Sequence, residues 1–453
     1  MILPLYCEDN GRPVTNVPRR MLKAEVLQFL YDWTDREIVD HAQYNIVVKW
    51  FLELTIDEEP FDFTALSKFR VKLGEKLHRE LFDDIKRQIK EAGFSSLHQV
   101  VDATDVEGDV ALLDTTQLIQ KMCAHVQKKL ERAGYTLPAT AEEKKKETLQ
   151  DAVKKASSLI ETTSDISEIQ NEREMLKSVL EDYTEYDERG EAKERKQKGS
   201  GRLVSVTDPD VRWGAKSDKK MWAGYKAHLM MDENRTITSV TVTSGNVTDD
   251  KEALPLYDQQ EDNPVTVTGD GLYGTGENRR AFNERGCHLI APLRGQENCT
   301  SLFPKSKFSW DGEKVTCPAG KTTDKFTDNK RSRCYVFRFR GKDCQGCRLK
   351  PQCTPGHYRT ISISYYQKEF DEAEKFNSTP EYTAHMKKRA SIEPKNAEMK
   401  NSHGLARARY RGLERVTIQA LLTAIAVNLK NFIRLLKKAA KSAAQRKLSI
   451  SNG

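Results

Sequence analysis

Apolar residues recur at helical spacing through the first hundred residues of the chain. Three amphipathic stretches follow one another over residues 18–93, and the first carries apolar side chains on one face between Leu22 and Leu30. Thr34 and Glu37 match the capping-box pattern at the start of the second stretch. The pattern predicts a helical domain over residues 1–100.

Basic residues on the third helical stretch suggest a partner for this domain. Lys68 and Arg70 lie close together there, and several short helices with bases on one of them are typical of a helix-turn-helix-like DNA-binding unit. A plain helical bundle explains the same pattern equally well. If the domain is a DNA-binding unit, Lys68 and Arg70 are candidate DNA contacts.

The period of the apolar pattern changes after residue 100. The segment DVALLDTTQL is a short apolar run that ends in an acid, Asp114, and it predicts a buried strand with a carboxylate at its end. Residues 117–200 return to a helical, highly charged pattern, which predicts a helical hairpin or coiled coil inserted into the fold. The last part of this insert, EYDERGEAKERKQKGSGR, predicts a flexible linker because it is polar and charged throughout.

Strand-like and helix-like segments alternate over residues 221–295. The runs MWAGYKAHLMMD and TITSVTVTSGN predict a β-hairpin. A short helix, a strand ending at Asp270, a glycine turn, a helix and a final strand follow. This order predicts a mixed α/β sheet, and we assign its first part, with the helical insert, to residues 101–295.

Two further segments complete the predicted organisation. Residues 296–365 interrupt the sheet with a cysteine-rich insert, and residues 366–453 supply the last part of the core and basic C-terminal helices. Thr379 is placed to cap one of these helices. Pro394 follows Glu393 directly and predicts a break or kink in that helix just past the acid.

The charge of the chain is concentrated near its C-terminus. The whole chain of 453 residues is 38% hydrophobic and 31% charged, with a net charge of +7. Between Lys387 and Lys447, sixteen Lys and Arg stand against three Glu. Such one-sided charge is typical of a surface that faces nucleic acid.

Membrane insertion and secretion are not expected from the sequence. No run of eighteen or more consecutive apolar residues occurs, so no membrane span is predicted. The first ten residues, MILPLYCEDN, lack a basic region followed by an apolar one, which disfavours a secretory signal. We expect a cytoplasmic protein.

The cysteines suggest a metal site. The chain has nine, and five of them fall between Cys317 and Cys353, a clustering that favours metal binding over disulfides outside the secretory pathway. Cys344, Cys347 and Cys353, with Cys317 upstream, supply four thiolates for a structural zinc ion. Buried thiols without metal are the alternative, and Cys334 could replace one of the four.

Three acids stand out by position. Asp114 and Asp270 end predicted strands, and Glu393 lies on a late helix in the basic region. Strand ends at one edge of an α/β sheet converge, and a helix packed there can add a third carboxylate. Such a set would suit Mg²⁺, which prefers oxygen ligands. A single Asp is more often a turn or cap residue, and spacing alone does not raise these three above other acids.

Several motifs together resemble a known family. The segments LLDTT and GDGLYG, and the signature in which Arg389, Glu393 and Lys400 keep Arg-x3-acid-x6-Lys spacing, are similar to those of bacterial insertion-sequence transposases of the DDE type. The segments TDPDVRWGAK, GYKAHLMMD and VTSGNVTDDKEAL resemble further strands of that core. The chain departs from the family signature at Met386, where a tyrosine is expected.

The resemblance implies an α/β fold of the ribonuclease-H-like type, in which a mixed sheet is flanked by helices. It implies that Asp114, Asp270 and Glu393 bind Mg²⁺ or Mn²⁺ and catalyse cleavage and strand transfer of DNA ends. Arg389 and Lys400 would share a face with Glu393 if the helix continues through Pro394, and would then grip DNA phosphates. An exposed ion pair is the alternative for these two bases.

The resemblance also implies partners. These are the terminal repeats of the mobile element, its target DNA and a second subunit in the active complex, with a location at the nucleoid. Two alternatives share the motifs: a related nuclease that only hydrolyses DNA, and an inactive DNA-binding remnant.

Overall fold

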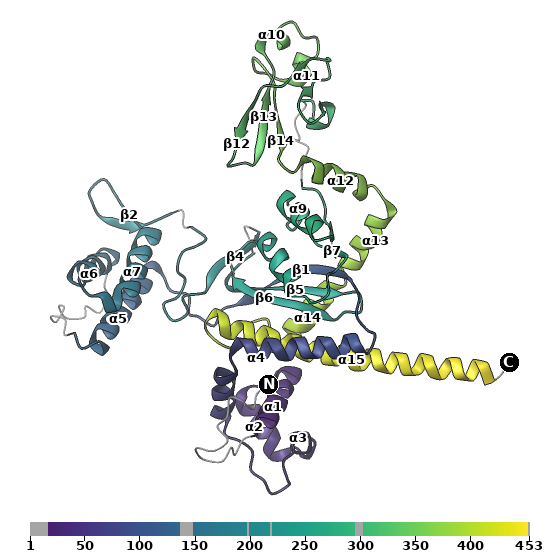
Figure 1. Cartoon of the computed structure of the whole chain (residues 1–453). Coiled ribbons are helices and arrows are strands. Elements are labelled where there is room, and N and C mark those ends of the chain that lie inside the picture. Colours follow the sequence, from purple (N-terminus) through teal and green to yellow (C-terminus); the bar gives the residue numbers. More distant parts are fainter. Residues whose placement is uncertain (1–16, 136–147, 197–198, 218–219, 295–301, 452–453) are drawn as a thin grey trace. The chain divides into compact units, whose positions relative to one another are not determined.

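The computed structural model describes residues 17–135, 148–196, 199–217, 220–294 and 302–451 (Figure 1). The chain divides into two compact units. The first unit consists of Met1–Ser95, Ala103–Thr248 and Ile392–Gly453, and the second of Ser96–Asp102 and Asp249–Ser391. 

A mixed β-sheet is the central element of the fold. Its strands follow the order β4-β5-β1-β7-β8, and β6 also pairs with β5. The β4–β5 and β5–β6 pairs are antiparallel, whereas β1–β7 and β7–β8 are parallel. The predicted mixed α/β sheet is confirmed. Its strands are β1 (His98–Glu107), β4 (Arg212–Ser217), β5 (Lys220–Asp232), β6 (Ile237–Ser244), β7 (Thr266–Thr268) and β8 (His288–Ile290).

The β5–β6 hairpin is the best example of a locally encoded element. Tyr225, Ala227 and Leu229 alternate along β5, and all are buried in the core of the first unit. The backbone turns back after Asp232, whose carboxylate accepts a hydrogen bond of 2.9 Å from the N–H of Thr236. The predicted hairpin is confirmed.

The N-terminal helices follow the sequence pattern with two exceptions. The capping box of Thr34 and Glu37 is present at the start of α2. The predicted second helix is split, because the Asn45 side chain accepts the N–H of Val47 and begins a separate helix. Gly74 adopts a φ of 64° and kinks helix α4. The helices are α1 (Pro18–Tyr31), α2 (Asp35–Tyr44), α3 (Ile46–Phe51) and α4 (Phe63–Glu91).

The predicted helical insert has a hydrophobic core of its own. Three helices bury apolar faces against one another, as their helical periodicity predicts. The segment predicted as a flexible linker instead forms a short antiparallel hairpin in its described part. The elements are α5 (Thr115–Arg132), α6 (Leu149–Thr162), α7 (Gln170–Tyr183), β2 (Thr184–Tyr186) and β3 (Ala192–Glu194).

Helix α15 (Leu413–Ser451) supplies much of the core of the first unit. Figure 1 shows it alongside α4, and buried residues of both helices belong to one apolar cluster. Among the described residues, it is the one helix long and apolar enough to cross a membrane by length and composition. Its most apolar window is 78% buried inside the protein, as in a core helix.

The second unit combines part of the sheet with helices and two small sheets. Apolar residues of the cysteine-rich insert, including Phe308, Phe337 and Ile361, form a separate small core. The helices are α8 (Ala253–Asp258), α9 (Gly276–Glu284), α10 (Gly341–Cys344), α11 (Lys350–Cys353), α12 (Gln367–Asn377) and α13 (Pro380–Arg389). The small sheets are β9 (Ser309–Trp310), β10 (Val315–Thr316) and β11 (Thr322–Thr323), and β12 (Phe326–Asn329), β13 (Cys334–Arg338) and β14 (Thr360–Ser364).

Candidate functional site

Two carboxylates of the second unit belong to neighbouring parallel strands, one within its strand and the other just past the end of its strand. Strands β1 and β7 pair in parallel, with Val100 opposite Thr268. Asp102 and Asp270 each lie two residues further along, so continuing the register places them side by side on the same face. Both residues are half-buried. This pair is the best-defined acidic constellation at a sheet edge.

The turn after Asp270 holds its carboxylate in place. Oδ1 of Asp270 accepts a hydrogen bond of 2.7 Å from the N–H of Leu272. The backbone before it is tightly packed, because a Cβ on Gly269 would lie 2.9 Å from Cδ2 of Tyr273 and 3.0 Å from Cγ1 of Val101. Only glycine fits there without a shift, so the first glycine of GDGLYG lets the strand approach its neighbours closely.

The pKa of Tyr273 reflects the negative charge at this edge of the sheet. Its side chain is fully buried, and its hydroxyl has no hydrogen-bond partner among the described residues. Burial raises the pKa of Tyr273 well above its usual value, and the carboxylates of Asp249, Asp102, Asp270 and Glu252 raise this pKa further. Negative charge from four carboxylates therefore acts on one buried hydroxyl, although no three acids of the described residues are grouped closely enough to hold a metal ion as they stand.

Helix α14 (Ile392–Ser402) carries the third acid of the sequence prediction. Glu393 is exposed in the first turn, and Lys400 lies seven residues later on the same face. Nζ of Lys400 donates to Asp105 on β1 at 2.9 Å, and Nζ of Lys216 donates to the same carboxylate at 2.6 Å. Lys400 thus fastens α14 to β1 within the first unit.

Asp105 stays ionised between these two bases. Burial alone would raise the pKa of this carboxyl, but the hydrogen bonds from Lys216 and Lys400 outweigh burial and hold the pKa well below its usual range. The ion pair is therefore present at neutral pH.

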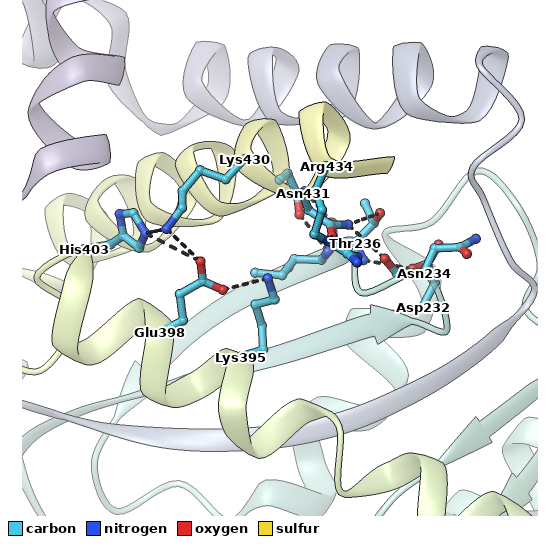
Figure 2. Close-up of polar contacts among 11 residues, drawn as sticks. Asp232, Asn234, Thr236, Lys395, Glu398, His403, Lys430, Asn431 and Arg434 are labelled. Carbon is cyan, nitrogen blue, oxygen red and sulfur yellow. Dashed lines mark hydrogen bonds and ion pairs between the residues drawn. The ribbon is translucent and has the colours of Figure 1, made fainter. Parts of the chain in front are cut away.

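A second polar network fastens α14 to α15 (Figure 2). Glu398 accepts hydrogen bonds of 2.9 Å from both Lys395 and Lys430. Lys430 also lies 3.1 Å from Nε2 of His403, whose Nδ1 is 2.7 Å from the carbonyl oxygen of Phe29. Burial lowers the pKa of His403, so the ring is neutral and can accept from Lys430 through Nε2. The network holds the helix that carries Glu393.

Asp114 does not end a strand, so the prediction of a strand there is wrong. The described strand is β1, which ends at Glu107, and Asp114 is an exposed N-cap whose carboxylate accepts the N–H of Gln117 at 2.8 Å. The acid that follows an apolar run on a central strand is instead Asp102, in VVDAT. Both acids match the pattern of an acid followed by small or hydroxyl residues: Ala103 and Thr104 follow Asp102, and Thr115 and Thr116 follow Asp114.

Arg70 is buried, which contradicts the prediction that it contacts DNA. Only 6% of the residue is exposed, and its guanidinium bonds to Gln28 and forms a short ion pair with Asp35. Tyr410 lies under the same guanidinium at 5.0 Å. Arg70 is therefore a structural residue of the first unit. Lys68 is exposed on α4, as a DNA contact would require.

The helix break near Pro394 differs from the prediction. Helix α13 ends at Arg389, and α14 begins at Ile392, so the break precedes Glu393. Pro394 fits in the first turn of α14, where its missing N–H has no helical partner to lose. Arg389 and Glu393 therefore do not share one continuous helix, and only Glu393 and Lys400 share a helix face.

The four predicted zinc cysteines gather around one small cavity in the second unit. Cys317, Cys344, Cys347 and Cys353 all line it. Burial raises the pKa of Cys353, and the other three thiols raise this pKa further because they lie close by. The spare cysteine, Cys334, lies on β13 instead. Across the described residues, no three His, Cys, Asp or Glu side chains are grouped closely enough to hold a metal ion as they stand.

Comparison with protein families identifies the chain. The model of the family described as Transposase DDE domain matches residues 192–429, more than half of the sequence. The chain belongs to the DDE transposase family. A second model, Transposase domain (DUF772), matches residues 1–72. Neither the curated proteins nor the solved structures gave a match.

Membership settles the broad class of the protein. It is a transposase, and its mixed sheet with flanking helices is a ribonuclease-H-like core. The family acts on DNA and generally transfers strands with the help of a divalent metal ion. Asp270, Glu393 and Lys400 lie inside the matched stretch, whereas Asp102 lies between the two matched stretches.

Proposed function

We propose that this transposase cleaves the ends of its own element and joins them to target DNA with Mg²⁺ or Mn²⁺. Asp102, Asp270 and Glu393 would hold the metal ions. The observation that supports this assignment is the parallel pairing of β1 with β7, in which Val100 lies opposite Thr268. Continued by two residues, this register would set Asp102 beside Asp270. Glu393 is assigned from its place in the Arg-x3-acid-x6-Lys signature.

The chemistry consists of two displacements at phosphorus. Water first attacks the phosphodiester at the element end, which leaves a 3′-hydroxyl on the element. That hydroxyl then attacks a target phosphodiester in line, and the new O–P bond forms as the target strand's O–P bond breaks. Bound metal ions would activate the attacking oxygen and stabilise the leaving one.

Basic residues near Glu393 in the sequence would position the DNA. Arg389 and Lys400 are proposed to contact phosphates, and Lys400 can do so while keeping its bond to Asp105, because an ammonium has three N–H donors. Lys68 is proposed as a contact of the N-terminal domain. Cutting two element ends together calls for two active sites, so we propose a homodimer in the complex with DNA, located at the nucleoid in the cytoplasm.

Removing the metal ion tests the proposed function. The substrate is duplex DNA with the inverted repeats that flank the coding region, incubated with a target plasmid. With Mg²⁺ or Mn²⁺ we expect strand cleavage at the repeat ends and joined products. Both should fall to background in chelator and return when Mg²⁺ is restored.

Two outcomes of this assay would separate the alternatives. Cleavage without joining of a pre-cut 3′-hydroxyl end indicates a nuclease, and binding without either reaction indicates an inactive remnant. Cleavage that persists undiminished in chelator contradicts the metal-dependent mechanism itself.

We also propose a structural zinc ion at Cys317, Cys344, Cys347 and Cys353. Four thiols around one small cavity match the tetrahedral sulfur set that structural zinc takes. The ion would tie α10 and α11 to the turn at Cys317. A site with four protein ligands is closed to substrate, so this zinc would take no part in the DNA chemistry.

The zinc site predicts a difference between two cysteine substitutions. Protein never exposed to chelator should contain one zinc per chain, measured by elemental analysis. Cys347→Ser should lose most of this zinc, whereas the matched control Cys334→Ser should keep it, because Cys334 does not line the cavity. Equal zinc loss in both variants, or a metal-free parent protein, would contradict the assignment.

A further inference from the structure

The C-terminal part of α15 leaves the core of the first unit. Residues from Val416 to Val427 are almost entirely buried, but every residue from Leu436 to Gln445 is exposed. Figure 1 shows this last part of the helix continuing past the end of α4, the helix alongside which it runs. We call residues 433–445 the C-terminal arm.

Basic side chains form a single line along the arm. Arg434, Lys437, Lys438 and Lys441 are spaced by three, four and seven residues from the first, which places them on one face of the helix. All four are exposed. The sequence after Glu414 contains no Asp or Glu up to its last residue, so no acid of the arm can pair with this face.

A helix of this kind is poorly stabilised by its own residues. Arg434 and Lys438, and likewise Lys437 and Lys441, are like charges at i,i+4 spacing, which disfavours a helix. From Leu436 onward the arm also lacks the tertiary packing that supplies most helix stability in proteins. A bound polyanion would remove the repulsion that the isolated arm contains.

We propose that the C-terminal arm binds the phosphate backbone of duplex DNA outside the catalytic centre, without reading base sequence. The basic face from Arg434 to Lys441 spans about 10 Å along the helix. With a rise of about 3.4 Å per nucleotide, this length reaches roughly three consecutive phosphates of one strand. DNA as the partner rests on the proposed function of the protein.

Charge argues against a second copy of the arm as the partner. Two such arms would bring together bases only, because neither contains an acid. The exposed apolar residues Ile433 and Leu436 lie beside the basic face and would be the contacts in an arm-to-arm dimer. Phosphates complement the basic line directly, so DNA is the favoured occupant.

The salt dependence of DNA binding tests the proposal. The probe is a duplex of unrelated sequence in chelator, so that no strand is cut. The variant K437Q/K438Q/K441Q should bind at least about tenfold more weakly near 0.1 M salt. Its slope of log K against log salt should be shallower by about 2 to 3, because each lost phosphate contact removes roughly 0.9. Arg434 is kept because it bonds to Asn431.

A matched control removes the same charge elsewhere. Lys121, Lys128 and Lys154 are exposed lysines of the helical insert, and K121Q/K128Q/K154Q should leave most of the slope unchanged. Equal losses in both triple variants would show a general charge effect and overturn the proposal. An unchanged slope in the arm variant would also overturn it, as would an I433E/L436E variant that dissociates a dimer while binding DNA normally.

The proposed catalytic function can fail independently of the arm. Asp270→Asn removes a carboxylate and no base, so in chelator it should bind DNA at least as tightly as the parent even though it cannot cut. If the arm variant binds weakly while the metal-dependent reactions are absent from the parent, the arm assignment survives and the catalytic one does not.

Discussion

We expect Asp102→Asn to reduce cleavage and joining by roughly a thousandfold or more, while Asp114→Asn leaves both near the parental rate. A ligand of a catalytic metal ion contributes several kcal/mol to the transition state, and about 4 kcal/mol corresponds to this factor. Asp270→Asn should behave like Asp102→Asn, because the register of β1 and β7, continued two residues past Val100 and Thr268, sets the two residues beside each other.

Asp114→Asn is a close control for this experiment. Asp114 caps α5 through its side-chain oxygen, and Asn caps helices about as well as Asp. Both substitutions remove one carboxylate and keep the side-chain size. The measurement is single-turnover cleavage of terminal-repeat DNA, with DNA binding in chelator as the check on folding. A full loss in Asp114→Asn together with an active Asp102→Asn would refute the reassignment.

Elements with local signals could be predicted from the sequence. The capping box at Thr34 and Glu37, the β5–β6 hairpin and the strand, turn and helix around Asp270 all appear where the pattern places them. Each depends on residues a few positions apart, such as a cap and its acceptor or an alternating strand. Asp270 could therefore be placed at a strand end without a structure.

The sequence does not predict strand β1, because acids interrupt its apolar pattern. Asp102 and Asp105 both lie within the strand, and an alternation argument reads such residues as surface or turn. The structure explains Asp105 through Lys216 and Lys400, which are 111 and 295 residues away in the sequence. A local sequence pattern cannot predict partners at that distance. By its pattern alone, the neighbouring apolar run that ends at Asp114 is therefore the stronger candidate for a strand.

Arg70 illustrates the same limit for charged residues. Its position on an amphipathic helix suggested an exposed base, yet Glu25, Asp35 and Tyr410 surround it. A buried arginine needs such partners, and they come from α1, α2 and the segment before α15. Burial of a charge is therefore decided by tertiary structure, and the sequence could supply only the candidate.

The network at Glu398 should be the most sensitive polar site for the stability of the first unit. Glu398→Gln keeps the shape of the side chain but leaves Lys395, which is 3% exposed, without a counter-charge. We expect a loss of about 2–3 kcal/mol at neutral pH, since a buried charge that loses its partner is costly. Thermal unfolding should shift down by roughly 3–5 °C.

Acid should erase the difference between Glu398→Gln and the parent. Burial alone would raise the pKa of Glu398, but the hydrogen bonds from Lys430 and Lys395 outweigh it and lower the pKa to about 2. The unfolded-state pKa of a Glu is about 4.3, so the carboxylate stabilises the fold fully above that pH and loses this effect as the pH falls toward 2.

The difference in melting temperature should therefore be largest near pH 7 and shrink between about pH 4.3 and pH 2. Glu188→Gln, an exposed substitution in the β2–β3 hairpin, should show little difference at any pH. A Glu398→Gln protein that melts with the parent at pH 7 would contradict a stabilising role for the network. Because α14 also carries Glu393, its loosening should lower DNA cleavage at temperatures where the parent remains fully active.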